Sequence, residues 1–219
     1  MKRFLLVAAI GFLLNSCMDL NMRFQIGKDW SNDLTLSLQM LDQFYKMMEM
    51  QMAQAGGDLS LFDKDALTAL VNSQGGEIKK FSNQVVEGMR QIGVQVKFPD
   101  ARSMFTSMSQ DQMSLAQEGE DWVWRFNNEQ MEAALSGLDP QQLEQQLSML
   151  LPSLSGLKLN LELEVPHLVE TNLQKAEGQI ARFSIDFDKD ITGKTGKEIA
   201  DLFLSIARPK WVKFRLENP

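Results

Sequence analysis

Apolar and polar residues alternate strictly in several stretches of this chain, and this pattern constrains the fold more than any other feature. The clearest stretch runs from Leu157 to Val165 and stops at Pro166. Alternation gives an extended strand one apolar and one polar face, which is typical of antiparallel sheets with one face in water. The same pattern predicts strands over residues 20–26, 34–40, 81–89, 92–98, 113–117, 122–126 and 181–187, and a last edge strand over 212–216.

Between the strands, apolar residues recur every three or four positions, a spacing that indicates amphipathic helices. One of these helices has a start signal, because Asp139 and Gln142 form a capping box and Pro140 suits the first turn. We expect a single α+β domain over 17–219, an antiparallel sheet of about seven to nine strands with amphipathic helices packed on one face. The helices are expected over 41–52, 66–71, 139–152 and 199–206.

The first residues have the parts of an export signal. Lys2 and Arg3 form a basic start, and residues 4–14 carry no charge. This apolar stretch of 11 residues fits the roughly 7–15 of a signal peptide and falls short of the ~20 that a membrane-spanning helix needs. Residues 1–16 are therefore expected to be a signal peptide that is removed.

The segment Leu14-Asn15-Ser16-Cys17 resembles the lipobox of bacterial lipoproteins, in which an aliphatic residue and two small residues precede an invariant cysteine. Asn15 departs from the commonest choices at its position. The resemblance implies cleavage between Ser16 and Cys17 and a thioether-linked diacylglycerol on Cys17, because only a thiol forms that bond. Cys17 is the only cysteine of the chain, so its use as an anchor leaves no disulfide in the domain.

The residue after the cysteine bears on location. It is Met18, whereas an aspartate there favours retention in the inner membrane in the lipoprotein class. The resemblance therefore implies the outer membrane, facing the periplasm, in a Gram-negative host, and the outer face of the plasma membrane otherwise. In either host the first partner that we expect is a membrane, reached through the lipid on Cys17.

The expected mature domain is acidic. Loss of residues 1–16 removes Lys2 and Arg3 and changes the formal net charge from −7 to −9. Such a charge repels nucleic acid and anionic lipid head groups as non-specific partners. We therefore expect no nucleic-acid binding.

The order of these features resembles that of the LppM-like bacterial lipoproteins, over roughly residues 17–190. The likeness rests on the lipobox, an immediate hairpin, helices, a second hairpin with aromatic strands, and a strand ending at Val165-Pro166 with Val169 and Asn172 after it. It implies a role at the envelope that involves lipids or glycolipids, and it carries over no catalytic residue. Many members of that family have a C-terminal transmembrane helix, whereas this chain ends in the charged segment 210–219.

The chain offers no recognisable catalytic set. His167 is its only histidine and no serine has a G-x-S-x-G context, so a nucleophile and a base at a known spacing are missing. One histidine and a lipidated cysteine also exclude a zinc site built from several such ligands. Asp186, Asp188 and Asp190 alternate but lack the glycine and closing glutamate of an EF-hand loop, so a solvated strand end is favoured over a calcium site. We expect no enzyme and no cofactor.

Methionine is unusually frequent, with 14 residues in the chain and a cluster over 47–52. Met48, Met50 and Met52 have the spacing of soft thioether ligands for Cu(I). On a helix, however, Met50 lies about 200° round from Met48, so core packing of Met48 and Met52 is favoured.

Large apolar side chains supply the remaining functional candidates. We expect them to line a pocket for acyl chains or to present a surface to a partner. The first hypothesis is a non-enzymatic lipoprotein that binds a lipid or another hydrophobic envelope component. The alternative is a structural or assembly lipoprotein that docks a protein partner, and a Cu(I)-binding protein comes third. The candidate residues are Phe44, Met48 and Met52 from a helix and Trp122 and Trp124 from a strand.

Overall fold

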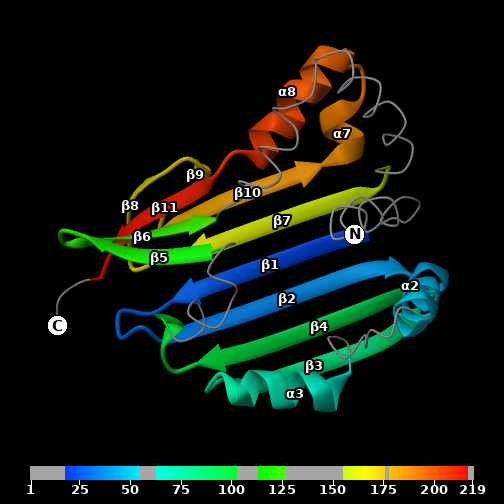
Figure 1. Ribbon diagram of the computed structural model, residues 1–219, viewed down its shortest axis with the longest axis horizontal. Helices are drawn as coiled ribbons and strands as arrows, with labels where there is room; N and C mark the ends of the chain where they lie inside the picture. The colour runs from blue at the N-terminus through cyan, green and yellow to red at the C-terminus, as the bar shows by residue number, and fades with distance from the viewer. Residues whose placement is uncertain (1–17, 55–62, 103–112, 127–154, 176–177, 217–219) are drawn as a thin grey trace.

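Two β-sheets dominate the computed structural model, which describes residues 18–54, 63–102, 113–126, 155–175 and 178–216 (Figure 1). The α+β class is as predicted, with two sheets in place of one. Sheet A has the strand order β3 (Glu77–Val86), β4 (Met89–Phe98), β2 (Asn32–Leu41), β1 (Met18–Ile26), β7 (Leu157–Glu164), β10 (Ile180–Asp186) and β9 (Gln174–Lys175). Sheet B has the order β5 (Met113–Glu118), β6 (Asp121–Phe126), β11 (Lys210–Arg215) and β8 (His167–Thr171). The helices of the described residues are α2 (Asp42–Gln54), α3 (Lys64–Ser73), α7 (Phe187–Ile191) and α8 (Gly196–Ala207).

Local hairpins follow the alternation of the sequence. As predicted, β1 pairs antiparallel with β2, β3 with β4 and β5 with β6. The turn between β3 and β4 consists of Glu87 and Gly88, which have positive φ values of 52° and 79°. Two such residues give the turn a twist that matches the flanking strands. β3 therefore ends at Val86 and does not continue to Met89.

Three features differ from the prediction of one antiparallel sheet. β1 and β7 pair in parallel, beginning with Met18 opposite Leu157. A long connection separates these strands, and alternation along a strand does not encode the direction of its neighbour. β11 lies between β6 and β8, so it is an internal strand and not an edge. Phe187 begins α7 instead of ending β10, because the Asp186 side chain accepts a hydrogen bond from the Lys189 amide and caps the helix.

Three of the four predicted helices are present as α2, α3 and α8. α8 begins with a complete capping box, in which Thr195 and Glu198 each accept a hydrogen bond from the other's backbone amide. The fourth predicted helix, over 139–152, lies outside the described residues, as do residues 1–17. Among the helices that the structure describes, none is long and apolar enough to cross a membrane.

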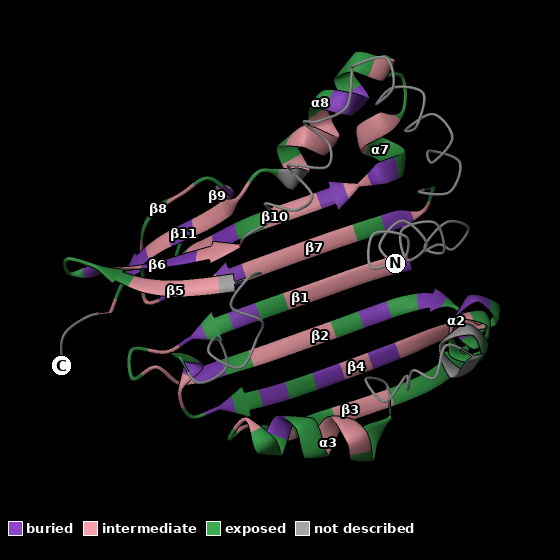
Figure 2. Ribbon diagram, in the orientation of Figure 1, coloured by how far each residue is buried: buried purple, intermediate pink, exposed green. Residues whose placement is uncertain are grey.

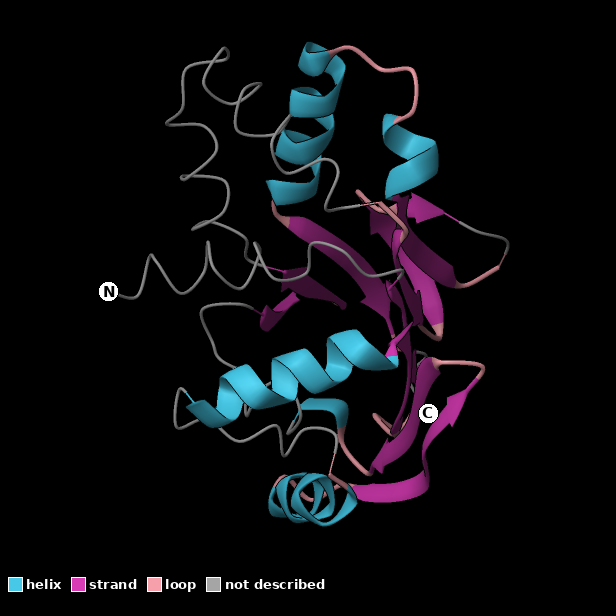
Figure 3. Cartoon of the chain, turned by 90° about the vertical axis from the view of Figure 1, so that its right-hand side faces the viewer, coloured by secondary structure: helices cyan, strands magenta, loops and turns pink. Residues whose placement is uncertain are grey.

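The two faces of sheet A differ in polarity. On β1 and β2 the even-numbered side chains form the apolar face, which we call the inner face, and the odd-numbered ones form the polar outer face. The helices α2, α3 and α8 and sheet B lie on the inner side (Figures 1 and 3). Helices packed on one face are therefore as predicted, and the buried residues of both sheets join into one core (Figure 2).

Sheet A is closed at one end of its strands, which we call the distal end. There the β1–β2 loop packs against sheet B, with the Trp30 ring centre 4.6 Å from that of Trp122 and 6.2 Å from that of Phe214. Phe24 and Trp124 meet edge to face at 5.2 Å. Trp124 and Phe214 have no exposed surface, so sheet B seals this end of the inner face.

The opposite end, which we call the proximal end, is where β1 begins and β2 ends, and α2 lies across it (Figure 3). Asp42 starts this helix, and its amide donates a hydrogen bond to the Gly88 carbonyl at 3.0 Å. Its carboxylate accepts from Lys46 at 2.8 Å and from Arg90 at 2.6 Å. These hydrogen bonds hold the pKa of Asp42 below its ordinary value, and the bond from Lys46 has the largest effect. The Arg90 guanidinium also lies 4.1 Å from the centre of the Tyr45 ring, so α2 and the β3–β4 hairpin form one unit.

Candidate functional site

The structure places the predicted hydrophobic residues in two separate regions. Phe44 and Met48 belong to α2 at the proximal end, whereas Trp122 and Trp124 belong to β6 at the distal end. Phe44 is 5% exposed and Trp124 is fully buried, while Met48 and Trp122 are half-buried against the core. The structure therefore does not bring these four residues together, and their role in binding stays a prediction. The side chain of Met52, and all of Ser16 and Cys17, lie outside the described residues.

A row of apolar side chains crosses the middle of the inner face, and we call it the central row. It consists of Leu36, Met22, Leu161 and Phe183, which stand side by side on β2, β1, β7 and β10. All four are only half-buried. Because neighbouring strands lie about 4.8 Å apart, the row forms a continuous apolar band across four strands.

The rows on either side of the central row are more completely covered. Toward the distal end, Phe24 is 4% exposed, and Leu163 and Ala181 are fully buried. Toward the proximal end, Leu38 and Ile185 are buried at 5% and 3% exposure, while Leu20 and Leu159 between them are half-buried. The central row is thus the row of the inner face in which all four apolar side chains retain accessible surface, and this surface continues to Leu20 and Leu159 in the next row.

A cation lies beside the central row. The Nζ atom of Lys210 on β11 is 5.7 Å from the centre of the Phe183 ring and donates a hydrogen bond to the Ser205 carbonyl. Burial lowers the pKa of the Lys210 ammonium, and the charge of Arg208 adds to the shift. An apolar band with a partly buried cation at its side can receive a hydrocarbon chain that ends in a carboxylate or phosphate.

The outer face carries a row of short polar side chains on the same strands. Ser37, Asn21, Asn160 and Ser184 stand in register across β2, β1, β7 and β10. Ser184 donates to the Asn160 side chain at 2.6 Å, Asn160 to Asn21 at 2.8 Å and Asn21 to Asp19 at 2.7 Å. Because these side chains are short, the outer face is hollowed here by about 480 Å³.

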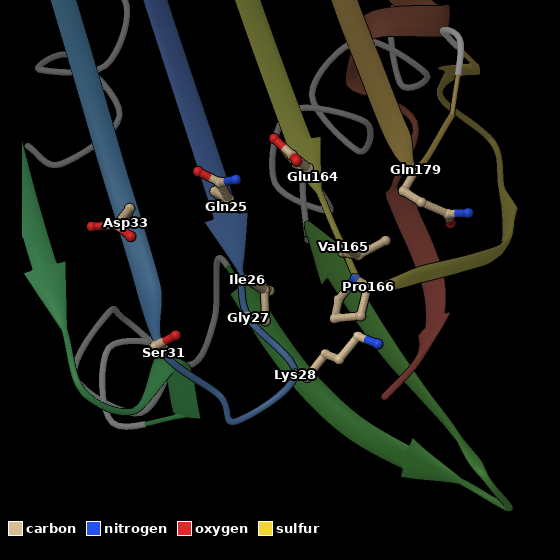
Figure 4. Close-up of a pocket in the computed structure, with 10 residues that line it drawn as sticks. All are labelled: Gln25, Ile26, Gly27, Lys28, Ser31, Asp33, Glu164, Val165, Pro166 and Gln179. Atoms are coloured by element: carbon tan, nitrogen blue, oxygen red, sulfur yellow. The ribbon is translucent and has the colours of Figure 1, made fainter. Parts of the chain in front are cut away.

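Paired charges border this hollow. Arg182 pairs with Glu162, and Arg23 pairs with Glu164 at 2.7 Å, so the border carries no net charge from these four residues. The hydrogen bond that Arg23 donates to the Glu164 carboxylate raises the pKa of Arg23. A second hollow of about 430 Å³ continues the outer face at the distal end, where Gln25, Asp33 and Glu164 project from adjacent strands (Figure 4).

The acidic residues singled out in the sequence have structural partners. Asp186 caps α7, Asp188 accepts from the Gly156 amide at 2.9 Å, and Asp190 accepts from the Asp186 amide at 2.9 Å. His167 is exposed at the start of β8. Within the described residues, no three acidic, histidine or cysteine side chains are grouped to hold a metal ion.

The central row is the feature that the sequence interpretation missed. All four residues were placed on predicted strands, but their alignment depends on the pairing of β1 with β7, which joins distant parts of the chain. Met22, Leu161 and Phe183 lie in the middle of their strands. This position is the one feature of the sequence that could have indicated the central row.

Comparison with known proteins gives a likeness in structure but none in sequence. No protein-family model and no curated protein matches the sequence. Among solved structures, the chain is similar to the folded domain of the LppM protein of Mycobacterium tuberculosis, determined by NMR, with a TM-score of 0.45 and 12% sequence identity over 94% of each chain. At this similarity, nothing about a ligand or partner follows for the present chain.

Proposed function

We propose that this protein is a bacterial lipoprotein, anchored to the cell envelope through Cys17, that binds a lipid or another hydrophobic envelope component on the inner face of sheet A. The anchor is supported by the lipobox-like segment and by the absence of any other cysteine. Ligand binding is supported by the central row, whose four apolar side chains all keep accessible surface. The role is one of binding and not of catalysis.

Hydrocarbon is the ligand chemistry that the central row favours. Leu36, Met22 and Leu161 offer no hydrogen-bonding side chain, so a polar ligand would lose its water without compensation. Each methylene that leaves water on such a surface contributes about 0.8 kcal/mol. Met22 adds a flexible, polarizable side chain that adapts to ligands of different shape.

Lys210 gives the proposed ligand an orientation. Its ammonium lies beside Phe183, at one end of the row, so a carboxylate or phosphate there gains a charge-assisted hydrogen bond. The formal charge of −9 over residues 17–219 opposes anionic ligands at long range, so this contact acts only after the chain has docked.

Native mass spectrometry of the full, processed chain from a bacterial host tests the proposal, with organic extraction of whatever co-purifies. We expect a stoichiometric lipid in addition to the covalent lipid on Cys17. Leu161→Phe, which fills the central row, should lower the occupancy several-fold, whereas Ser37→Ala on the outer face should not change it. A processed protein that carries no extractable lipid and gains none from envelope lipids would contradict ligand binding.

A protein partner is the second candidate, and the outer face favours it. This face has no helix over it among the described elements (Figure 3), and it offers amide, hydroxyl and paired charged groups. Polar surfaces of this kind form the rim of many protein interfaces. In-cell crosslinking from Ser184 tests this alternative. A single specific adduct would support it, and its loss in the Asn160→Leu variant would place the contact on the outer face.

A further inference from the structure

Exposed apolar side chains gather at the proximal end of sheet A. Among the described residues, seven large hydrophobic side chains are exposed, and five of them lie on the end of β2, on the β3–β4 hairpin or on α2. These five are Leu41 at 38% exposure, Met47 at 37%, Met50 at 60%, Val85 at 48% and Val86 at 42%. We call them the proximal patch.

The proximal patch wraps around the end of the sheet, with Leu41 and Val86 on the outer face and Val85 and α2 on the inner side. Leu41 pairs with Met89, and Met89 pairs with Val86, so three strands contribute apolar residues to one row. Asp42 directly follows Leu41 and joins α2 to the hairpin through its contact with Gly88. The patch is therefore built on a rigid unit.

The expected lipid anchor enters the fold at this same end. Met18 is the first residue of β1, and Asp19 pairs with Gln39, two residues before Leu41. Cys17 directly precedes Met18 in the sequence, so a lipid on Cys17 is attached one residue before the start of β1. The acyl chains proposed on Cys17 would thus leave the domain beside the proximal patch.

We propose that the proximal patch is a membrane-contacting surface that rests in the head-group region of the bilayer holding the Cys17 lipid. This inference depends on the proposed anchor and adds the orientation of the domain. Tethering makes the contact intramolecular, so weak apolar contacts suffice to fix it. Met47 and Met50 suit an irregular lipid surface because their side chains are unbranched and flexible.

The contact is apolar rather than electrostatic. Lys46 and Arg90, beside the patch, both pair with Asp42, and the acidic domain is repelled by anionic lipid. Membrane contact should therefore persist on zwitterionic lipid and at high salt. In this orientation the strands of sheet A lead away from the bilayer, and the distal end with sheet B is farthest from it.

Site-specific fluorescence on the full, processed chain tests the orientation. A lipidated Cys17 has no free thiol, so Met50→Cys and, as the matched control, Lys28→Cys in the exposed β1–β2 loop at the distal end each offer a single site for an environment-sensitive dye. The labelled proteins are placed in phosphatidylcholine vesicles. We expect blue-shifted emission and several-fold weaker iodide quenching at position 50 than at position 28, unchanged in high salt.

Two results would overturn the inference. One is equal iodide quenching of the two dyes on protein that floats with the vesicles. The other is shielding of position 50 in native envelopes but not in pure lipid vesicles, which would assign the patch to a protein partner. Failure of the anchor itself is distinguished by mass, because the protein then lacks the diacylglycerol and does not float.

Discussion

The two ends of sheet A expose very different surfaces. At the distal end, Phe24 of sheet A is almost fully buried because it packs against Trp124 and Phe214 of sheet B, which have no exposed surface themselves. At the proximal end, Met40 on the inner face is also buried, whereas Leu41 and Val86 are exposed because they lie on the uncovered outer face. At the proximal end, Leu41 and Val86 thus interrupt the polar pattern of the outer face, and the face on which an apolar residue lies decides whether it holds the fold or remains available for contact.

The largest expected effect comes from truncating the sealed end. Trp124→Ala should lower the free energy of unfolding by about 3–5 kcal/mol, because it removes a fully buried ring that packs against Phe24. Met50→Ala at the proximal end should change it by less than about 0.5 kcal/mol. Urea denaturation followed by circular dichroism measures both. Comparable losses would show that the two ends do not differ as described.

Overpacking separates the central row from its covered neighbour. Leu163→Phe should cost about 1–3 kcal/mol, because Leu163 is fully buried and has no space for a larger ring. Leu161→Phe, two residues earlier on the same face of β7, should cost under about 1 kcal/mol because Leu161 is only half-buried. The urea midpoints of the two variants measure these two costs. An equal cost for both would mean that the central row is a closed core.

Replacing glycine by alanine in a turn at either end should cost a similar amount of stability. The two ends therefore differ in their exposed side chains and not in the backbone of their turns. Gly88→Ala should cost about 1–2 kcal/mol, because its φ is +79° although nothing would touch the added Cβ. Gly119→Ala, in the β5–β6 turn with a φ of +69°, should cost a similar amount. Thermal unfolding gives both values. A neutral Gly88→Ala variant would argue against the described turn and the position of Val86 next to it.

The smallest effect is an acid dependence shared by both ends. Hydrogen bonds from Arg215 hold the pKa of Asp121 below its ordinary value, as those from Lys46 and Arg90 do for Asp42. A folded pKa below the unfolded value of about 3.9 contributes stability that is present above that pH and is lost as the pH falls through the folded pKa. Urea midpoints should therefore be flat near neutral pH and fall below about pH 4. Asp121→Asn and Asp42→Asn should each flatten this fall, and a wild-type acid slope in both would contradict the assignment.

Local structure was predictable from the sequence because it depends on neighbours along the chain. The hairpins β1–β2 and β3–β4 follow from alternation around turn-forming residues, and α8 follows from apolar spacing. Long-range pairing was not predictable in the same way. The parallel contact of β1 with β7 and the separation of sheet B require the order of strands in space, which periodicity does not carry.

The candidate site was harder to predict than the fold. Trp124 and Phe44 were singled out for size and hydrophobicity, and these same properties placed them in the core. Met22 and Leu161 looked ordinary in the sequence, and their half-buried position results from the arrangement of other elements over the sheet. Short strands such as β8 also escaped prediction, because five residues with one apolar neighbouring pair show no clear alternation.

Photochemical mapping of the ligand tests the central claim most directly. The full, processed chain is incubated in vesicles with a diazirine-bearing fatty acid, irradiated and digested, and the labelled residues are identified by mass spectrometry. The proposed function predicts adducts on the central row, at Met22, Leu36, Leu161 or Phe183, that are lost in Leu161→Phe. Adducts confined to the proximal patch would instead show contact with the bilayer alone and would contradict a lipid-binding inner face.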